Sequence, residues 1–141
     1  MKIVAIKERT NNEHRTAITP DTAKLFVKKG YSVFVEKNIG TRANFTDAEY
    51  QAAGAIVSAI PLEILSDADI ILKVQPTMLV DEFNEVAMAK EGATIIGMLS
   101  PYNNSEYIDK SLSKKLATIS MELVPRITKA QGMDVLSSQS N

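Results

Sequence analysis

Six short apolar segments, separated by helix-like stretches, constrain the fold of this chain more than any other feature. They lie at residues 3–6, 32–35, 55–57, 69–74, 94–99 and 117–121. Several are continuously apolar, which is typical of strands that are covered on both faces. Strands that alternate with helices at this spacing form βαβ units. We therefore predict an α/β fold with a doubly wound parallel sheet, arranged as a flavodoxin-like three-layer sandwich.

Capping residues indicate where the intervening helices begin and end. Thr19 can cap a helix that starts at Pro20 and ends before Gly30. Thr46 and Glu49 have the spacing of a capping box and are expected to open a second helix. Further helices are expected over residues 61–66, 81–90 and 103–115.

Composition narrows the classes of function. The chain has 141 residues, enough for one domain with a single core. Its formal net charge of −1 includes no block of like charge, which argues against a nucleic-acid partner. With no cysteine and one histidine, neither a disulfide nor a multi-histidine metal site can form, so no metal is expected. No apolar run approaches the ~20 residues that span a bilayer, which predicts a soluble domain.

Polar residues gather where the predicted strands end. In an open α/β sheet, ligands bind beyond the carboxyl ends of the strands. That edge is the best candidate site from the pattern alone. Its polar residues are Lys7, Glu8, Arg9, Lys73, Gln75, Ser100, Tyr102 and Arg126, and Pro76, Pro101 and Pro125 form the turns.

Lys73 and Arg15 each allow two interpretations. Lys73 ends an apolar strand, so its stem can pack while its amine reaches water, or it can present a charge to an anionic or carbonyl group. Arg15 is by default a solvated loop residue, and His14 beside it is expected to point to water.

The segment from residue 125 to 138 carries the densest chemistry. Arg126 offers a donor fork, Gln131 donors and an acceptor, Asp134 a carboxylate and Ser137 a hydroxyl. Such a set matches a planar carboxamide like that of nicotinamide. The alternative is a polar loop and helix start in which Asp134 pairs with Arg126. No Gly-x-Gly-x-x-Gly or Walker pattern occurs, so the chain has no phosphate-binding loop of its own.

The residues resemble a known family at several places. KERTNNEHRTAITP, residues 7–20, is similar to the N-terminal signature that alanine dehydrogenases share with the α subunits of proton-translocating NAD(P) transhydrogenases. The resemblance continues through Gly40, Asp47, residues 52–55 and 71–74, and covers essentially the whole chain.

Two places separate the branches of this family. Alanine dehydrogenases carry a catalytic histidine where this chain has Ser100, and residues 124–141 resemble the transhydrogenase loop named for its Arg, Gln and Asp. One alternative is an alanine dehydrogenase-like, NAD-dependent amino-acid dehydrogenase. Another is a non-catalytic, flavodoxin-like regulatory module of receiver type. Residues 7–9 disfavour the second alternative, because a receiver needs clustered acids after its first strand.

The resemblance implies the N-terminal part of the NAD(H)-binding component of a transhydrogenase, which transfers hydride between NAD(H) and NADP(H) and couples this to proton translocation. Arg126, Gln131, Asp134 and Ser137 match the positions that order the nicotinamide, as both catalytic and cofactor-binding residues. Arg15 and Lys73 match the carboxylate- and carbonyl-binding pair of alanine dehydrogenases, which makes them candidates for a substrate pocket.

The resemblance also implies an organisation. Residues 1–125 would form the N-terminal α/β domain, and residues 126–141 the nicotinamide-site loop with the truncated start of an interdomain helix. A Rossmann lobe is expected after Asn141, so NAD(H) is expected as cofactor of the full-length protein and none for these residues alone. The implied partners are membrane-spanning and NADP(H)-binding components and a second copy in a homodimer. The implied location is the cytoplasmic side of the inner membrane.

Overall fold

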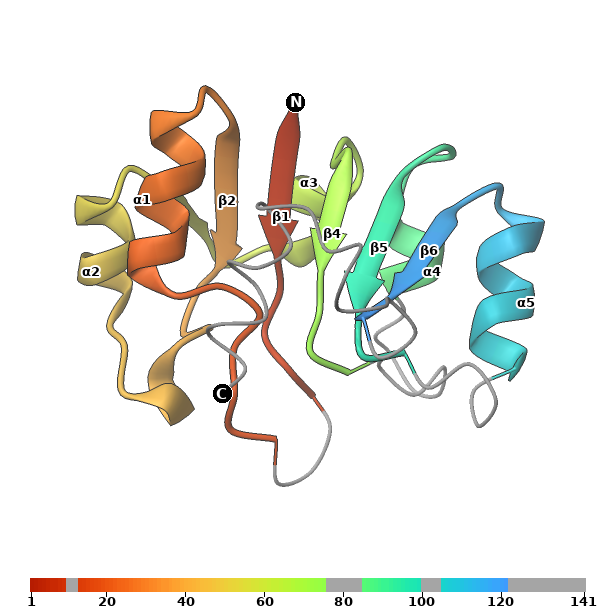
Figure 1. The fold of residues 1–141 in the computed structure, drawn as a ribbon, viewed down its shortest axis with the longest axis horizontal. Coiled ribbons are helices and arrows are strands. Elements are labelled where there is room, and N and C mark those ends of the chain that lie inside the picture. Colours follow the sequence, from red (N-terminus) through yellow and green to blue (C-terminus); the bar gives the residue numbers. More distant parts are fainter. Residues whose placement is uncertain (10–12, 76–84, 100–104, 122–141) are drawn as a thin grey trace, which may run out of the picture.

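All strands of the described structure belong to one parallel sheet. The structure is a computed structural model that describes residues 1–9, 13–75, 85–99 and 105–121. The sheet has six strands in the order β3-β2-β1-β4-β5-β6, and every neighbouring pair is parallel (Figure 1). The strands are β1 (Lys2–Ala5), β2 (Ser32–Glu36), β3 (Ile56–Ser58), β4 (Ile70–Leu72), β5 (Thr94–Gly97) and β6 (Ala117–Ser120). The predicted parallel α/β sheet is confirmed.

The strand order reverses direction once. From β1 the chain winds outward through β2 and β3, and then it crosses back to β4 beside β1 and continues to β5 and β6. This is the 3-2-1-4-5-6 order of dinucleotide-binding folds, whereas the flavodoxin order is 2-1-3-4-5. The layered architecture was predicted, but the order itself was not. The topological switch point lies between β1 and β4.

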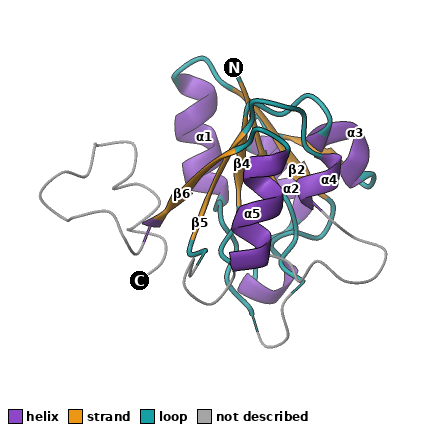
Figure 2. Cartoon of the chain, turned by 90° about the vertical axis from the view of Figure 1, so that its right-hand side faces the viewer, coloured by secondary structure: helices purple, strands orange, loops and turns teal. Residues whose placement is uncertain are grey.

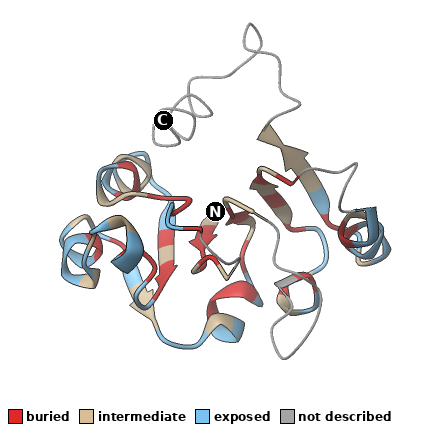
Figure 3. Cartoon of the chain, turned by 90° about the horizontal axis from the view of Figure 1, so that it is seen from below, coloured by how far each residue is buried: buried red, intermediate tan, exposed pale blue. Residues whose placement is uncertain are grey.

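Helices cover both faces of the sheet. They are α1 (Pro20–Lys28), the 3₁₀ turn η1 (Thr41–Ala43), α2 (Asp47–Ala52), α3 (Pro61–Leu65), α4 (Glu85–Met88) and α5 (Ser105–Ser113). Helices α1 and α2 lie on one face, and α3, α4 and α5 lie on the other (Figure 3). Viewed from the β6 edge, the sheet separates α1 from α3 and α4 (Figure 2).

The helix starts follow the predicted caps. The Thr19 side chain accepts a hydrogen bond from the backbone N–H of Thr22, and Pro20 occupies the first helical position. Thr46 and Glu49 form both hydrogen bonds of the capping box. The turn η1 was not predicted. Residues 81–84 of the predicted helix over 81–90 lie outside the described residues, as does Asn103, the predicted start of the helix over 103–115.

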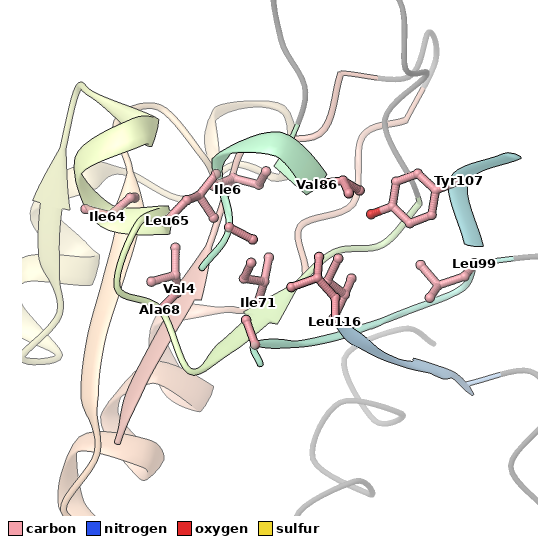
Figure 4. Close-up of a cluster of buried hydrophobic side chains, with 13 residues drawn as sticks. Val4, Ile6, Ile64, Leu65, Ala68, Ile71, Val86, Leu99, Tyr107 and Leu116 are labelled. Atoms are coloured by element: carbon pink, nitrogen blue, oxygen red, sulfur yellow. The ribbon is translucent and has the colours of Figure 1, made fainter. Parts of the chain in front are cut away.

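Two apolar clusters explain why the strands are continuously apolar. Along β1 and β4, Val4 and Ile71 pack toward α3, α4 and α5 (Figure 4). Their neighbours Ala5 and Leu72 pack toward α1 and α2. Each strand of this pair is therefore buried on both faces, and a charged residue can follow it only at its end. Lys73 stands at the end of β4.

Candidate functional site

Glu8 and Lys73 meet at the switch point, beyond the carboxyl ends of β1 and β4. The Glu8 carboxylate accepts hydrogen bonds from the backbone N–H groups of Val74 at 3.0 Å and Gln75 at 2.9 Å. The Lys73 Nζ lies 3.5 Å from Glu8 Oε1, and both side chains are buried. A buried charge is stable only when it is paired and hydrogen-bonded, and these contacts supply both conditions.

Lys73 is fixed by its strand and does not reach water. Its backbone N–H donates to the carbonyl of Ile96 at 2.9 Å, so the β4–β5 pairing continues past Leu72. A Cβ atom at Gly97 would lie 2.3 Å from the Lys73 carbonyl oxygen, so β5 approaches closely because residue 97 is glycine. The Lys73 side chain is 0% exposed. The interpretation of Lys73 as a lysine whose amine reaches solvent is therefore wrong.

A second carboxylate, Glu13, holds Arg15. Arg15 donates from Nε to Glu13 Oε2 and from Nη2 to Glu13 Oε1, both at 3.0 Å. This bidentate pair lowers the pKa of the Glu13 carboxyl below its usual value, although burial acts in the opposite direction. The same contact raises the pKa of Arg15. Arg15 is thus tied to a partner, although 43% of its side chain remains exposed.

Gln75 connects the two ion pairs. Its backbone N–H donates to Glu8, and its side-chain Nε2 donates to Glu13 Oε1 at 2.6 Å. The result is one network that ties the turn after β1, the turn after β4 and the segment before α1. We call these residues the switch-point network: Glu8, Glu13, Arg15, Lys73 and Gln75. Sequence reasoning selected Arg15 and Lys73 as site residues, but it missed that Glu8 and Glu13 hold them.

An open pocket adjoins the switch-point network on the β2 side. Its volume is about 290 Å³, and it lies between the turn after β1 and the segment after β2. Lys7, His14 and Arg42 are among its lining residues. His14 is exposed, as predicted.

The described switch point does not fit the phosphates of a dinucleotide. Such folds place the pyrophosphate against a glycine-rich turn between β1 and the following helix. Residues 6–19 contain no glycine here, and the buried carboxylate of Glu8 occupies this turn. A phosphate at this place would face a fixed negative charge, so the fold has the dinucleotide-binding strand order without the phosphate site.

The four predicted nicotinamide-site residues, Arg126, Gln131, Asp134 and Ser137, lie outside the described residues. So do Ser100, Tyr102 and the prolines at 76, 101 and 125. Strand β6 ends at Ser120, on the same carboxyl edge of the sheet as Lys73. Within the described ranges, no helix is long and apolar enough to cross a membrane, and no three potential metal ligands cluster.

Comparisons with known proteins agree on a family. The family described as "Alanine dehydrogenase/PNT, N-terminal domain" matches residues 4–141. The chain is 61% identical, over all of its 141 residues, to an NAD(P) transhydrogenase subunit alpha of Rickettsia prowazekii and covers 37% of that relative. It is 36% identical over 124 residues, 88% of this chain and 32% of the relative, to an alanine dehydrogenase of Methanococcus maripaludis.

A solved structure shows the same fold. The transhydrogenase from Sinorhizobium meliloti aligns with a TM-score of 0.84 and 37% identity, over 99% of this chain and 40% of that one. The chain therefore spans a little over a third of the length of the curated relatives it matches.

Proposed function

This chain belongs to the family of alanine dehydrogenase/PNT N-terminal domains, and from that premise we propose that it is the N-terminal part of the NAD(H)-binding component of an NAD(P) transhydrogenase. One observation carries the choice of branch. The transhydrogenase relative matches the whole chain at 61% identity, whereas the alanine dehydrogenase matches 88% of it at 36%. Ser100 points the same way, because its hydroxyl cannot replace a catalytic imidazole as a general base near neutral pH.

In this proposal the terminal loop orients the nicotinamide ring. Arg126, Gln131, Asp134 and Ser137 combine donors and acceptors that suit the ring's carboxamide. When bound, NAD(H) supplies or accepts the hydride, and the protein contributes position. Reacting atoms must approach to about 3–3.5 Å, so the residues that fix the ring act on the rate of transfer.

The switch-point network has a supporting role in the same proposal. Arg15 and Lys73, the substrate-pocket pair of the resemblance, are each paired here with a carboxylate. An incoming carboxylate would have to displace Glu13 from Arg15. We propose that the network instead holds the carboxyl edge of the sheet rigid beside β6, from which the terminal loop begins. The partners in this proposal are the membrane-spanning and NADP(H)-binding components and a second copy of the NAD(H)-binding component, on the cytoplasmic side of the inner membrane.

Single-turnover hydride transfer in the assembled transhydrogenase tests the role of the loop. Alanine substitutions of Arg126, Gln131 and Asp134 should each slow transfer far more than they weaken NADH binding, by up to about a hundredfold, since a misplacement of about 1 Å has such an effect. If Arg126 and Asp134 only stabilise a helix start, their variants should keep the wild-type rate and lose at most ~1 kcal/mol of stability. Wild-type rates in all three variants would contradict the proposed role of the loop.

A further inference from the structure

The pocket beside the switch-point network has walls of opposite character. One wall is the turn after β1, with Lys7, Glu8 and the segment from Glu13 to Arg15. The other is the segment from Asn38 to Arg42, which follows β2 and includes η1. The proposed hydride-transfer function uses none of the residues of the second wall.

The carboxylates of this pocket are already engaged. Glu8 is held by Lys73 and two backbone N–H groups, and Glu13 is held by Arg15 and Gln75. Lys7 and Arg42, in contrast, have no carboxylate partner within the described ranges of the chain. The pocket therefore presents two cations that its own acids do not neutralise, and this favours an anionic ligand.

The geometry of the second wall is fixed before any ligand arrives. The Asn38 backbone N–H donates to the Asp47 carboxylate at 2.9 Å, and Asn38 has a left-handed backbone with φ 65°. Arg42 reaches across the pocket and donates from Nη1 to the carbonyl of Glu13 at 3.4 Å. The remaining guanidinium donors stay available, because Arg carries five N–H groups in a rigid fork that matches an oxyanion.

We propose that this pocket binds a small, multiply charged oxyanion of the phosphate class, held by Lys7 and Arg42, with His14, Asn38 and Thr41 as further polar lining. The ligand is free phosphate or the phosphoryl group of a small metabolite. The two cations lie on opposite walls, so one anion that contacts both joins the turn after β1 to the segment after β2. This inference is independent of the proposed transhydrogenase function, since it involves no nicotinamide contact.

The single histidine of the chain provides the readout. Inorganic phosphate is titrated into the 141-residue protein at constant ionic strength and pH, and the ring C–H signals of His14 are followed by NMR. A saturable shift is expected. Arg42→Gln and Lys7→Gln should each weaken phosphate binding by about tenfold, the loss of one charge-assisted contact. Lys37→Gln is the matched control, because Lys37 is exposed beside the pocket but does not line it, and it should keep the wild-type affinity.

Further arms separate the sources of the ligand and exclude misfolding. Arg42→Lys retains the charge and should recover most of the affinity, whereas a folding defect would not be rescued. AMP that binds more tightly than phosphate, with no binding of adenosine, identifies a phosphorylated metabolite, and equal affinities identify free phosphate. The proposal is overturned if the His14 signals do not saturate, if the Lys7 and Arg42 variants bind like the control, or if succinate binds more tightly than phosphate.

Discussion

Glu8 has the most demanding environment of the described site residues. Its carboxylate is buried at the switch point, and only its contacts with Lys73, Val74 and Gln75 offset the loss of hydration. Removal of one partner from such a pair leaves an uncompensated charge, which costs more than the pair contributes. The energetic test of the switch-point network is therefore the removal of one partner compared with the removal of both.

Lys73→Met should destabilise the domain by about 3 kcal/mol, because Glu8 keeps its charge and its burial but loses its cation. The double variant Glu8→Gln with Lys73→Met should lose less than the single variant. Urea unfolding followed by circular dichroism measures both. Lys110→Met is the control, since Lys110 forms an exposed pair with Glu106 at 3.2 Å and should change stability by less than about 0.5 kcal/mol. A Lys73→Met variant as stable as this control would contradict the buried ion pair.

The lowered pKa of Glu13 predicts a pH dependence. Because Arg15 favours the ionised carboxylate, this contact stabilises the fold above the pKa of an unfolded glutamate, and the stabilisation disappears as the pH falls through the lower folded-state pKa. Wild type should therefore be more stable than Glu13→Gln at neutral pH, and the difference should vanish in acid. Lowered pKa values at Asp67 and Asp69 add to the acid sensitivity of both proteins and cancel in this difference. A difference in unfolding free energy that stays constant from about pH 7 to pH 3 would exclude the predicted linkage.

At the scale of elements, local signals predicted what local physics decides. The caps at Thr19 and Thr46 satisfy N–H groups within three residues, so residue type and spacing suffice to find them. The strands were located because burial on both faces leaves a continuously apolar run. The turn η1 gave no such signal, since a single 3₁₀ turn has neither periodicity nor a side-chain cap.

The closeness of β4 and β5 predicts the effect of a methyl group. Gly97→Ala should destabilise the domain by about 1–3 kcal/mol, because its Cβ would meet the Lys73 carbonyl oxygen and push the strands apart. The amide NMR signals of Val74 and Gln75, which donate to Glu8, should shift with it. Gly92→Ala is the comparison: φ +88° also makes alanine unfavourable there, but nothing lies within 4 Å of the added Cβ, so the Glu8-bound amides should stay in place. Unchanged Val74 and Gln75 signals in Gly97→Ala would contradict this coupling.

For the whole molecule, sequence reasoning reached the fold class but not the strand order. Hydrophobic patterns identify parallel strands, whereas the crossover from β3 back to β4 is a tertiary choice that no short segment records. The site shows the same limit. Lys73 and Glu8 are 65 positions apart in the sequence, so their pairing follows only once β1 and β4 are known to be neighbours. The candidate loop residues were selected by family resemblance, and they stay a prediction.

The strand order without a phosphate turn predicts weak nucleotide binding. The 141-residue protein should show no micromolar affinity for NADH in calorimetric titration, because Glu8 stands where a glycine-rich turn would bind the pyrophosphate. The full-length component, titrated in parallel, is the positive control. Micromolar binding by the 141-residue protein that persists when the phosphate pocket is removed by Arg42→Gln would contradict this assignment.

The choice between transhydrogenase and amino-acid dehydrogenase rests on which acceptor takes the hydride. NADH oxidation by the full-length protein, assembled with its NADP(H)-binding and membrane components, is measured with an NADP⁺ analogue and separately with pyruvate and ammonium. We predict rapid transfer to the NADP⁺ analogue and none to pyruvate, because Ser100 stands at the position of the catalytic histidine. Substantial turnover with pyruvate and ammonium, and none with the NADP⁺ analogue, would contradict the proposed function.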